Sequence, residues 1–371
     1  MSFEQILGHL TEPSDIHNAL FISRIWCQCT IPLIWSRPNI QDERTLRGLI
    51  RIIRLSTGRG RDFLHRTTQT TFPYHLLIKR LYFCALGARL QDEHVVEFQG
   101  CMALEKLTMK GNKYVSPRAL TALVRGKDKL VVAELGETRV DDHTLETLGR
   151  ECPELIGLSL PDCHHFTPLG FVAFAKTGIK KIKRLKLSRS IGVTSEGISA
   201  IVKVCPALLE IQLAGSPDVT DTALIDIWLN AGRLRELDIK GSDKVTAKGF
   251  PVLSELQVVG DRSEPPKTDE FGNVSFREPD SKTVPPEGDY SVFSTIPRSV
   301  PVTLSLGTLR TVDMEGCTGL TDAAIDALTW NARWIRAITL AKCTQLTDAS
   351  LLSLCRLGKQ LHHVHLGHVP K

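Results

Sequence analysis

The sequence predicts an α/β solenoid, in which a curved parallel β-sheet lines the inside and helices cover the outside, preceded by a small all-helical module. Three observations support this prediction. A pattern of apolar residues returns about every 26 residues from Ile78 onward, each copy joins a strand-like stretch to a helix-like stretch, and the first forty residues follow a different pattern. A chain of 371 residues is long enough for such an array.

The repeat has the form LxxLxL, with Cys, Asn, Ser or Thr three residues after the last Leu. Clear copies open at Leu104, Leu155, Ile182, Leu208, Leu234, Leu309, Ile335 and Leu361, and weaker copies open at Ile78 and Leu130. The first six starts, from Ile78 to Leu208, are 26, 26, 25, 27 and 26 residues apart. A fixed period of this size predicts a solenoid, here of about ten units.

Each unit divides into a strand, a turn and a helix. The LxL alternation is typical of a short strand with one buried face, and the stretch after the next Thr-Asp element has helical spacing, as in TDTALIDIWL from Thr220. The Thr or Ser ahead of that stretch can cap the helix, and Asp in its first turn is favoured by the helix dipole. Because one unit cannot bury its apolar face alone, we expect the strands to stack into a parallel sheet.

One segment interrupts the period. Residues 262–302 contain two Pro-Pro pairs, no apolar periodicity and more acidic than basic residues. We expect a disordered or loosely packed insertion that replaces the helical part of one unit. Two interpretations stay open: a regulatory loop whose Ser and Thr residues accept phosphate, or a spacer without a function of its own.

The first forty residues predict a separate helical module. A first helix has one apolar face, Pro13 ends it, and Asp15 can cap the next helix. The large apolar side chains of the module are Ile6, Leu7, Leu10, Ile16, Leu20, Ile25, Trp26, Leu33 and Trp35. So many in so short a stretch indicate a surface that contacts a partner, or one that caps the first repeat units.

This module resembles an F-box, in the stretches Ile6 to Leu10, Asp15 to Trp26 and Leu33 to Pro38. The repeats resemble the cysteine-containing subclass of leucine-rich repeats. An F-box ahead of such repeats, with TFPY at 71–74 before the first unit, is similar to the fungal glucose-repression-resistant F-box family. The LPxE opening usual in an F-box is absent, so we expect a short first helix and reduced adaptor affinity.

The resemblance implies a non-catalytic substrate-recognition subunit of a Skp–cullin–F-box ubiquitin ligase. Short helices would dock on a Skp-type adaptor, which joins a cullin scaffold, through Ile6, Leu7, Leu10, Ile16, Leu20, Trp26, Pro32, Leu33 and Trp35. The expected domains are an F-box-like module at 1–40, a helical linker at 41–77, and leucine-rich repeats at 78–371. The alternative is an interaction scaffold or inhibitor built on the same repeats, with the N-terminal helices as a cap.

Six of the ten cysteines fall on repeated positions. Three stand three residues before the first apolar residue of a unit, and three stand at the ninth position; they are Cys101, Cys152 and Cys205, and Cys163, Cys317 and Cys343. Repeated positions in a stacked core indicate packing, so we expect buried, unreactive thiols and not metal ligands or nucleophiles.

Positions 3, 5 and 7 of each unit are expected to face the concave side, the usual recognition surface of solenoids. The candidate substrate-binding residues on it are Arg80, Tyr82, Lys106, Lys110, Arg184, Lys186 and Lys240. The later half carries carboxylates, at Glu210, Glu236, Asp238, Asp313 and Glu315. We expect the basic half to bind an acidic or phosphorylated protein segment and the acidic half a basic one, against the alternative that these charges are only solvated.

Composition and the absence of known motifs argue against other classes of protein. No run of about 18 apolar residues occurs and the start lacks a secretory signal, so we expect a cytoplasmic or nuclear protein without a membrane contact. The formal charge of +5 is too mild to predict nucleic-acid binding. Neither GxSxG, GxxxxGK[ST] nor HExxH occurs, and we expect no cofactor, metal or catalytic residue.

Overall fold

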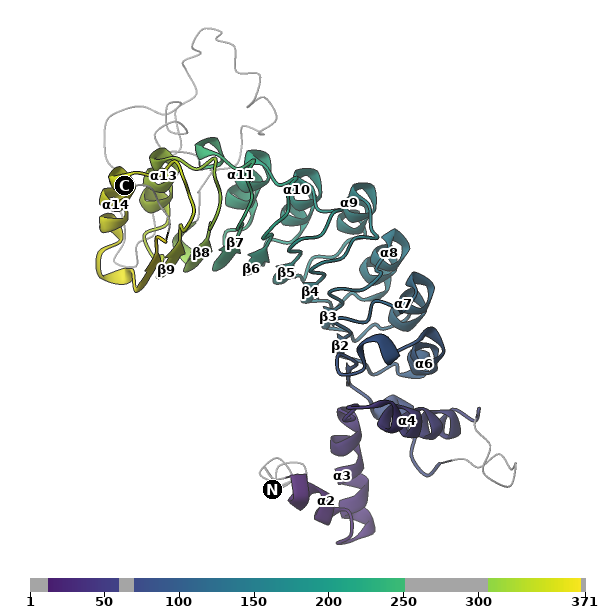
Figure 1. The fold of residues 1–371 in the computed structure, drawn as a ribbon. Helices are drawn as coiled ribbons and strands as arrows, with labels where there is room; N and C mark the ends of the chain where they lie inside the picture. Colours follow the sequence, from purple (N-terminus) through teal and green to yellow (C-terminus); the bar gives the residue numbers. More distant parts are fainter. Residues whose placement is uncertain (1–12, 60–69, 251–305, 368–371) are drawn as a thin grey trace, which may run out of the picture.

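The computed structural model describes residues 13–59, 70–250 and 306–367. Within these ranges the chain forms an arc of stacked units, with strands along the inner edge and helices along the outer edge (Figure 1). The predicted α/β solenoid is confirmed. Ile6, Leu7 and Leu10 of the predicted first helix and the predicted insertion at 262–302 lie outside the described residues.

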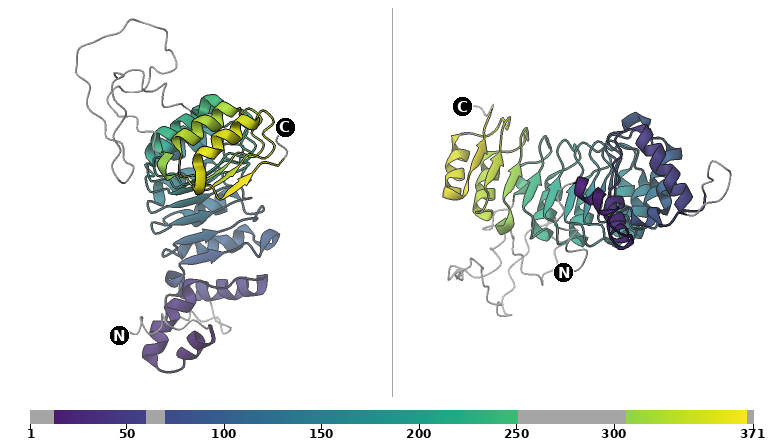
Figure 2. Two further views of the ribbon diagram at one scale, coloured as in Figure 1. Left: turned by 90° about the vertical axis from the view of Figure 1, so that its left-hand side faces the viewer. Right: turned by 90° about the horizontal axis from the view of Figure 1, so that it is seen from below.

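The described N-terminal helices stand at the end of the arc beside the first units (Figures 1 and 2). They are α2 (Pro13–Ala19), α3 (Arg24–Ser36), α4 (Glu43–Ser56) and α5 (Tyr74–Leu77). Ser23 caps α3 by accepting a hydrogen bond from the Trp26 amide, and Asp42 caps α4 by accepting one from the Thr45 amide at 2.7 Å. The Thr45 hydroxyl accepts a hydrogen bond from the Asp42 amide in return, so these two residues cap the start of α4 reciprocally.

Ten short strands form one parallel sheet in chain order. They are β1 (Arg80–Tyr82), β2 (Lys106–Thr108), β3 (Val132–Glu134), β4 (Gly157–Ser159), β5 (Arg184–Lys186), β6 (Glu210–Gln212), β7 (Glu236–Asp238), β8 (Thr311–Asp313), β9 (Ala337–Thr339) and β10 (His363–His365). Each strand holds positions 3 to 5 of its unit, and we number the units 1 to 10 after their strands. The register continues unchanged from β7 to β8, where Glu236 pairs with Thr311, so the break in the period does not interrupt the sheet.

The outer layer consists of one short helix in most units, and consecutive helices pack on one another. The helices are α6 (Asp92–Val96), α7 (Pro117–Val124), α8 (Asp142–Glu151), α9 (Pro168–Lys176), α10 (Ser195–Val204), α11 (Asp221–Asn230), α13 (Asp322–Asn331) and α14 (Asp348–Leu354). Single 3-10 turns add η1 (Gly87–Arg89), η2 (Glu97–Gly100), η3 (Ala247–Gly249), η4 (Leu306–Thr308) and η5 (Cys355–Gln360). A membrane-spanning length of apolar helix is absent from the described ranges.

The Thr-Asp element does more than start each helix. Thr167 caps α9 as predicted, with its hydroxyl accepting from the Gly170 amide at 3.1 Å. In addition, Asp142 of the preceding unit accepts hydrogen bonds from the Thr167 amide at 2.6 Å and from its hydroxyl at 2.8 Å. The pairs Asp221–Thr246 and Asp322–Thr347 repeat this contact. The aspartate therefore ties consecutive units together, a role that the sequence did not indicate.

The predicted burial of the six repeated cysteines is confirmed, because each is 0% exposed. At the ninth position, the thiols of Cys163, Cys317 and Cys343 donate to the position-6 carbonyl of the preceding unit, at 3.3, 3.2 and 3.1 Å. The Asn112 amide and the Ser190 hydroxyl make the same contact, at 3.4 and 2.6 Å. Burial raises the pKa of Cys317 to about 12, so this thiol keeps its proton and can act as the donor.

Candidate protein-interaction surfaces

Exposed apolar side chains lie on the α2–α3 turn and at several positions along α3. These residues, called here the N-terminal apolar surface, are Phe21, Ile22, Ile25, Leu33 and Ile34, with exposed fractions of 76, 61, 55, 47 and 36%. One side of α3 points inward and buries Thr30 and Ile31. A soluble protein seldom leaves so many large apolar side chains together in water, so this surface is a candidate contact with another protein.

The predicted adaptor-binding residues divide between this surface and the interior. Pro32 and Leu33 are exposed, whereas Ile16, Leu20 and Trp26 are half-buried. Trp35 is also half-buried, and its ring lies 4.3 Å from that of Tyr74, centroid to centroid. The next residue, Ser36, accepts a hydrogen bond from the Lys79 amide at 2.9 Å. Trp35 therefore helps to fix the end of α3 against the start of the solenoid.

Phe21, Ile22 and Ile34 were not among the predicted contact residues, and Ile25 was noted only as apolar. Apolar residues occupy more than one side of α3, so helical periodicity alone does not tell which side faces a partner. The sequence did hold one signal for this surface. The module contains more large apolar residues than three short helices can bury among themselves.

The lysines predicted to bind substrate on the concave face are engaged in ion pairs between neighbouring strands. Lys106 Nζ lies 2.6 Å from a Glu134 carboxylate oxygen, and Lys186 Nζ lies 2.6 Å from Glu210. Glu134 was not among the predicted residues, although it occupies position 5 of unit 3 within the half predicted to be basic. These pairs lower the net positive charge that the first half of the face presents to a ligand.

Two predicted arginines keep their charge available. Arg80 and Arg184 are exposed, and neither forms an ion pair with any residue in the described part of the chain. Near Arg80, the Arg37 guanidinium carbon lies 4.6 Å from the centre of the Tyr82 ring, and Lys106 Nζ lies 5.8 Å from it. The concave face thus begins with cations around an aromatic ring, close to the N-terminal helices.

The later half of the concave face is acidic but also partly neutralised. Asp238 and Asp313 are paired across β7 and β8, and burial, together with the charge of Asp313, raises the pKa of Asp238. Glu315 lies between Lys240 and Lys342, with Lys342 Nζ at 2.6 Å, and its hydrogen bonds to both lysines lower its pKa to about 2. Lys240, predicted to bind substrate, is therefore held by a carboxylate.

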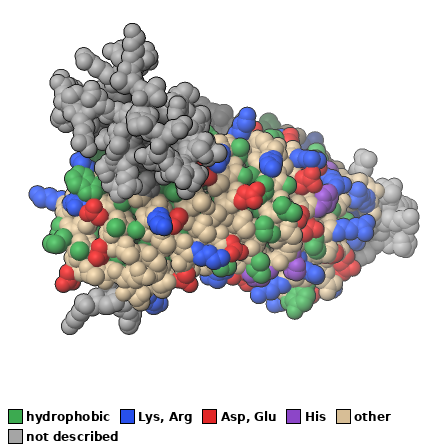
Figure 3. All heavy atoms as spheres, turned by 90° about the horizontal axis from the view of Figure 1, so that it is seen from above, with side chains coloured by type: hydrophobic (Ala, Val, Ile, Leu, Met, Phe, Trp, Pro, Cys, Tyr) green, Lys and Arg blue, Asp and Glu red, His purple; other side chains and the backbone are tan. Residues whose placement is uncertain are grey.

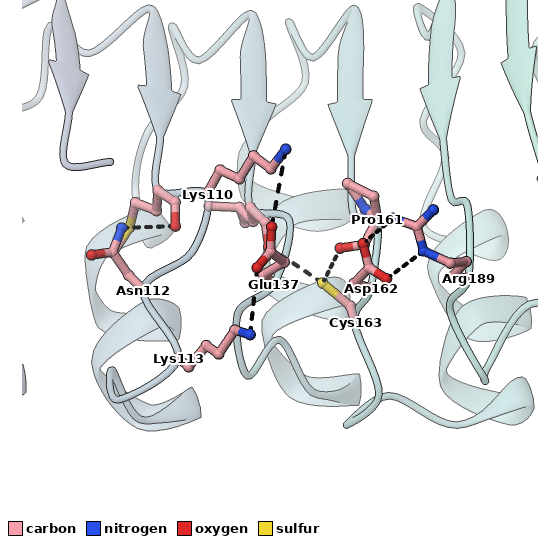
Figure 4. Close-up of polar contacts among 10 residues, drawn as sticks. Lys110, Asn112, Lys113, Glu137, Pro161, Asp162, Cys163 and Arg189 are labelled. Carbon is pink, nitrogen blue, oxygen red and sulfur yellow. Dashed lines mark hydrogen bonds and ion pairs between the residues drawn. The ribbon is translucent and has the colours of Figure 1, made fainter. Parts of the chain in front are cut away.

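A row of charged turns follows the strands of units 2 to 5 (Figure 4). Lys110 and Lys113 approach Glu137 at 4.0 and 3.5 Å, and Arg189 binds both oxygens of Asp162 at 2.6 and 2.7 Å. Glu137, Asp162 and Arg189 all have φ between 55° and 57°, at the position where four other units have glycine. Charged residues with a left-handed backbone are uncommon, and here they form salt bridges between turns.

Charges elsewhere are mixed, and no metal site is evident. On the face drawn in Figure 3, Lys and Arg side chains are interspersed with Asp and Glu. In the three described ranges, no three His, Cys, Asp or Glu side chains gather closely enough to hold a metal ion. The chemistry that these surfaces offer is non-covalent recognition by apolar, cationic and anionic side chains.

The repeat pattern and the one-to-one strand register define a leucine-rich-repeat solenoid protein. Among solved structures, the chain is similar to one in the crystal structure of the yeast Rad7–Elc1 complex, with 13% identity and a TM-score of 0.44 over 99% of this chain and 87% of that one. It is also similar to an internalin from Listeria monocytogenes, with 11% identity and a TM-score of 0.47 over 78% of this chain and 62% of that one. No known protein-family model matches the sequence.

Proposed function

We propose that the chain is the substrate-recognition subunit of a Skp–cullin–F-box-type ubiquitin ligase. The N-terminal apolar surface binds the Skp-type adaptor, and the concave face of the solenoid binds a protein substrate. The chain contributes no catalytic group. It holds the substrate near a ubiquitin-charged enzyme, which raises the effective concentration of the two reactants.

The observation that carries this proposal is the N-terminal apolar surface itself. Its five residues lie on α3 and on the turn before it, beyond the first repeat unit, in the module that resembles an F-box. Burial of exposed apolar area contributes about 25 cal/mol per Å², so a partner that covers these side chains gains several kcal/mol. The half-buried Ile16, Leu20 and Trp26 would complete the contact at its margin.

Substrate binding is assigned to the concave face because it offers cations that no described residue neutralises. Arg80 and Arg184 can each form paired, charge-assisted hydrogen bonds to a carboxylate or phosphate. Lys106, Lys110, Lys186 and Lys240 would bind such a group only by sharing or releasing their present carboxylate partners. An acidic or phosphorylated segment is the substrate chemistry that fits this arrangement.

The test is co-expression of the full chain with a Skp-type adaptor, followed by size-exclusion chromatography. The unaltered chain is expected to elute as a one-to-one complex. The double variant Phe21→Ala with Leu33→Ala should lose the complex while keeping its thermal unfolding midpoint, because both side chains lie mostly in solvent.

Leu169→Ala is the matched control, since Leu169 is 78% exposed but lies on the outer helix α9. It should leave the complex intact. Trp35→Ala is a second comparison and should lower the unfolding midpoint, because Trp35 packs on Tyr74. Absence of a complex with the unaltered chain, or a complex that survives the double variant, would favour the alternative of a scaffold whose N-terminal helices only cap the repeats.

A further inference from the structure

Three arginines form a row where the chain enters strands β7, β8 and β9. Arg235, Arg310 and Arg336 each occupy position 2 of their units. The Arg310 amide donates to the Arg235 carbonyl at 2.8 Å, and the Arg336 amide donates to the Arg310 carbonyl at 2.7 Å. Since strands of a sheet lie about 4.8 Å apart, the three side chains leave the backbone one strand spacing from each other. His362 extends the row to β10 by the same backbone contact, at 2.8 Å.

The row has no acidic partner among the residues that the structure describes. Arg235 and Arg336 are exposed and their side chains take part in no ion pair there. The Arg310 guanidinium donates only to carbonyl oxygens, of Gly307 at 3.1 Å, Leu309 at 3.2 Å and Trp334 at 3.5 Å. Burial, together with repulsion from Arg336 and Arg235, lowers the pKa of Arg310. An anion placed along the row would relieve this repulsion.

This arrangement differs from that of the concave face. There, Lys106, Lys186 and Lys240 are each paired with a carboxylate from a neighbouring strand. Among the described residues, the fold brings acidic side chains beside these lysines but not beside the arginine row. The row therefore keeps its charge with respect to the described part of the chain.

A half-exposed tryptophan, Trp334, lies beside the row, and a second, Trp330, lies on the nearby helix α13. Trp334 directly precedes unit 9, is 50% exposed, and its ring centre lies 5.8 Å from the Arg310 guanidinium carbon. Trp330 on α13 is 49% exposed and lies 5.9 Å from Arg333 and 4.7 Å from Arg356. Tryptophan and arginine are the residue types most enriched where a protein interface gains most of its affinity.

We propose that Arg235, Arg310, Arg336 and Trp334, called here the Arg–Trp edge, form a second protein-binding surface whose occupant is an extended, Asp- and Glu-rich segment of another protein. Charge complementarity selects this occupant, because guanidinium groups bind carboxylates with two parallel hydrogen bonds. An extended segment carries side chains of one face roughly every 7 Å, within reach of long arginines on adjacent strands. The indole of Trp334 offers a flat apolar surface for the backbone and aliphatic stems of that segment.

A protein segment fits the edge better than a nucleic acid. The arginine row crosses three strands, and the whole chain has a formal charge of only +5, whereas nucleic-acid binders extend their cations over a long basic surface. The edge uses position 2 of late units, so it is separate from Arg80 and Arg184 and from the N-terminal apolar surface. The inference therefore does not depend on the proposed ligase function.

The test measures binding of a fluorescein-labelled Glu-rich peptide to the full chain by fluorescence anisotropy, with a Gln-rich peptide of equal length as reference. The double variant Arg235→Gln with Arg336→Gln should weaken binding of the Glu-rich peptide by about tenfold or more. Trp334→Ala should also weaken it, and this loss should persist when salt is raised, because the indole contact is not ionic.

The charge-matched control is Arg118→Gln with Arg139→Gln, which removes two exposed arginines that lie outside both proposed binding surfaces and have no ion pair in the described ranges. Its affinity should stay within about twofold of that of the unaltered chain. An equal loss in both double variants would reduce the effect to general electrostatic attraction and overturn the proposal. Stronger binding of a single-stranded oligothymidylate than of the peptide, or no binding of the Glu-rich peptide to the unaltered chain, would overturn it as well.

Discussion

The N-terminal helices and the repeat units place their apolar side chains in opposite environments. In unit 4, Leu155, Leu158 and Leu160 are at most 1% exposed, because each neighbouring unit covers the next. In the N-terminal helical region, Phe21 of the α2–α3 turn and Leu33 of α3 are 76 and 47% exposed. The solenoid buries its apolar residues by stacking, whereas these side chains near the N-terminal helices are left exposed beside the described residues. The helices therefore have apolar residues left for a partner.

The largest expected effect is on the free energy of unfolding, and it is tested with one substitution in the solenoid and one in the N-terminal helices. Leu158→Ala should lower the free energy of unfolding by about 2–5 kcal/mol, because it leaves a cavity between stacked units. Leu33→Ala should lower it by less than about 1 kcal/mol, since the side chain is already largely in water. Urea unfolding followed by circular dichroism measures both. Similar losses for the two variants would mean that Leu33 packs within the chain, and the N-terminal apolar surface would then not be a docking site.

The sequence predicted the solenoid well because its information is local and repeated. The ten repeat starts from Ile78 to Leu361 indicated the number and place of the strands, and the ninth-position cysteines indicated a buried position. Position 4, on the predicted buried face of the strand, is buried in units 1 to 9, from Leu81 to Ile338, whereas Val364 of unit 10 is 43% exposed. Each of these features follows from a pattern within one unit and needs no knowledge of its neighbours.

Contacts between units were much harder to predict. Lys106 and Glu134 are 28 residues apart in the sequence, and only the register of β2 and β3 brings their side chains together. The same holds for Asp142 and Thr167, which are 25 residues apart. Exposure on α3 depends on which side packs on α2, so the exposure of Ile25 could not be assigned from periodicity. Five candidate substrate residues lie on strands, at Arg80, Tyr82, Lys106, Arg184 and Lys186, and Lys110 and Lys240 follow theirs. The ion-pair partners of the lysines were not predicted.

A smaller effect on stability is expected from the buried serine hydroxyls of the repeats, which differ in whether they form hydrogen bonds. Ser190 and Ser216 occupy the same ninth position in adjacent units, and both are buried. The Ser190 hydroxyl donates to the Leu160 carbonyl at 2.6 Å and accepts from the Cys163 amide at 3.1 Å, whereas the Ser216 hydroxyl has no partner among the described residues. Ser190→Ala should therefore cost about 1–3 kcal/mol of stability, and Ser216→Ala should cost nothing or stabilise slightly.

Thermal and urea unfolding of the two serine variants give the comparison directly, since the substitution and the position in the unit are identical. Equal losses would show that Ser216 has a hydrogen-bond partner in solution. In that case the ninth-position contact would run without interruption through units 5 and 6, and the two units would not differ in how they hold the sheet.

The smallest effect concerns exposed ion pairs on the concave face. Lys240 and Lys342 lower the pKa of Glu315 from an ordinary value of 4.5 to about 2. Because the folded-state pKa lies below the unfolded one, the pairs stabilise the fold above pH about 4.5, and this contribution is lost as the pH falls toward about 2. Glu315→Gln should therefore lower the unfolding midpoint slightly at neutral pH, and the difference from the unaltered chain should vanish in acid and shrink in high salt.

Glu236→Gln is the control, because Glu236 is exposed on the same face and has no ion pair within the described ranges. Its small effect on the unfolding midpoint should not follow this pH profile. A Glu315→Gln difference that stays constant from neutral to acidic pH would show that Glu315 acts through packing, and that the concave face holds its lysines less firmly than their distances indicate.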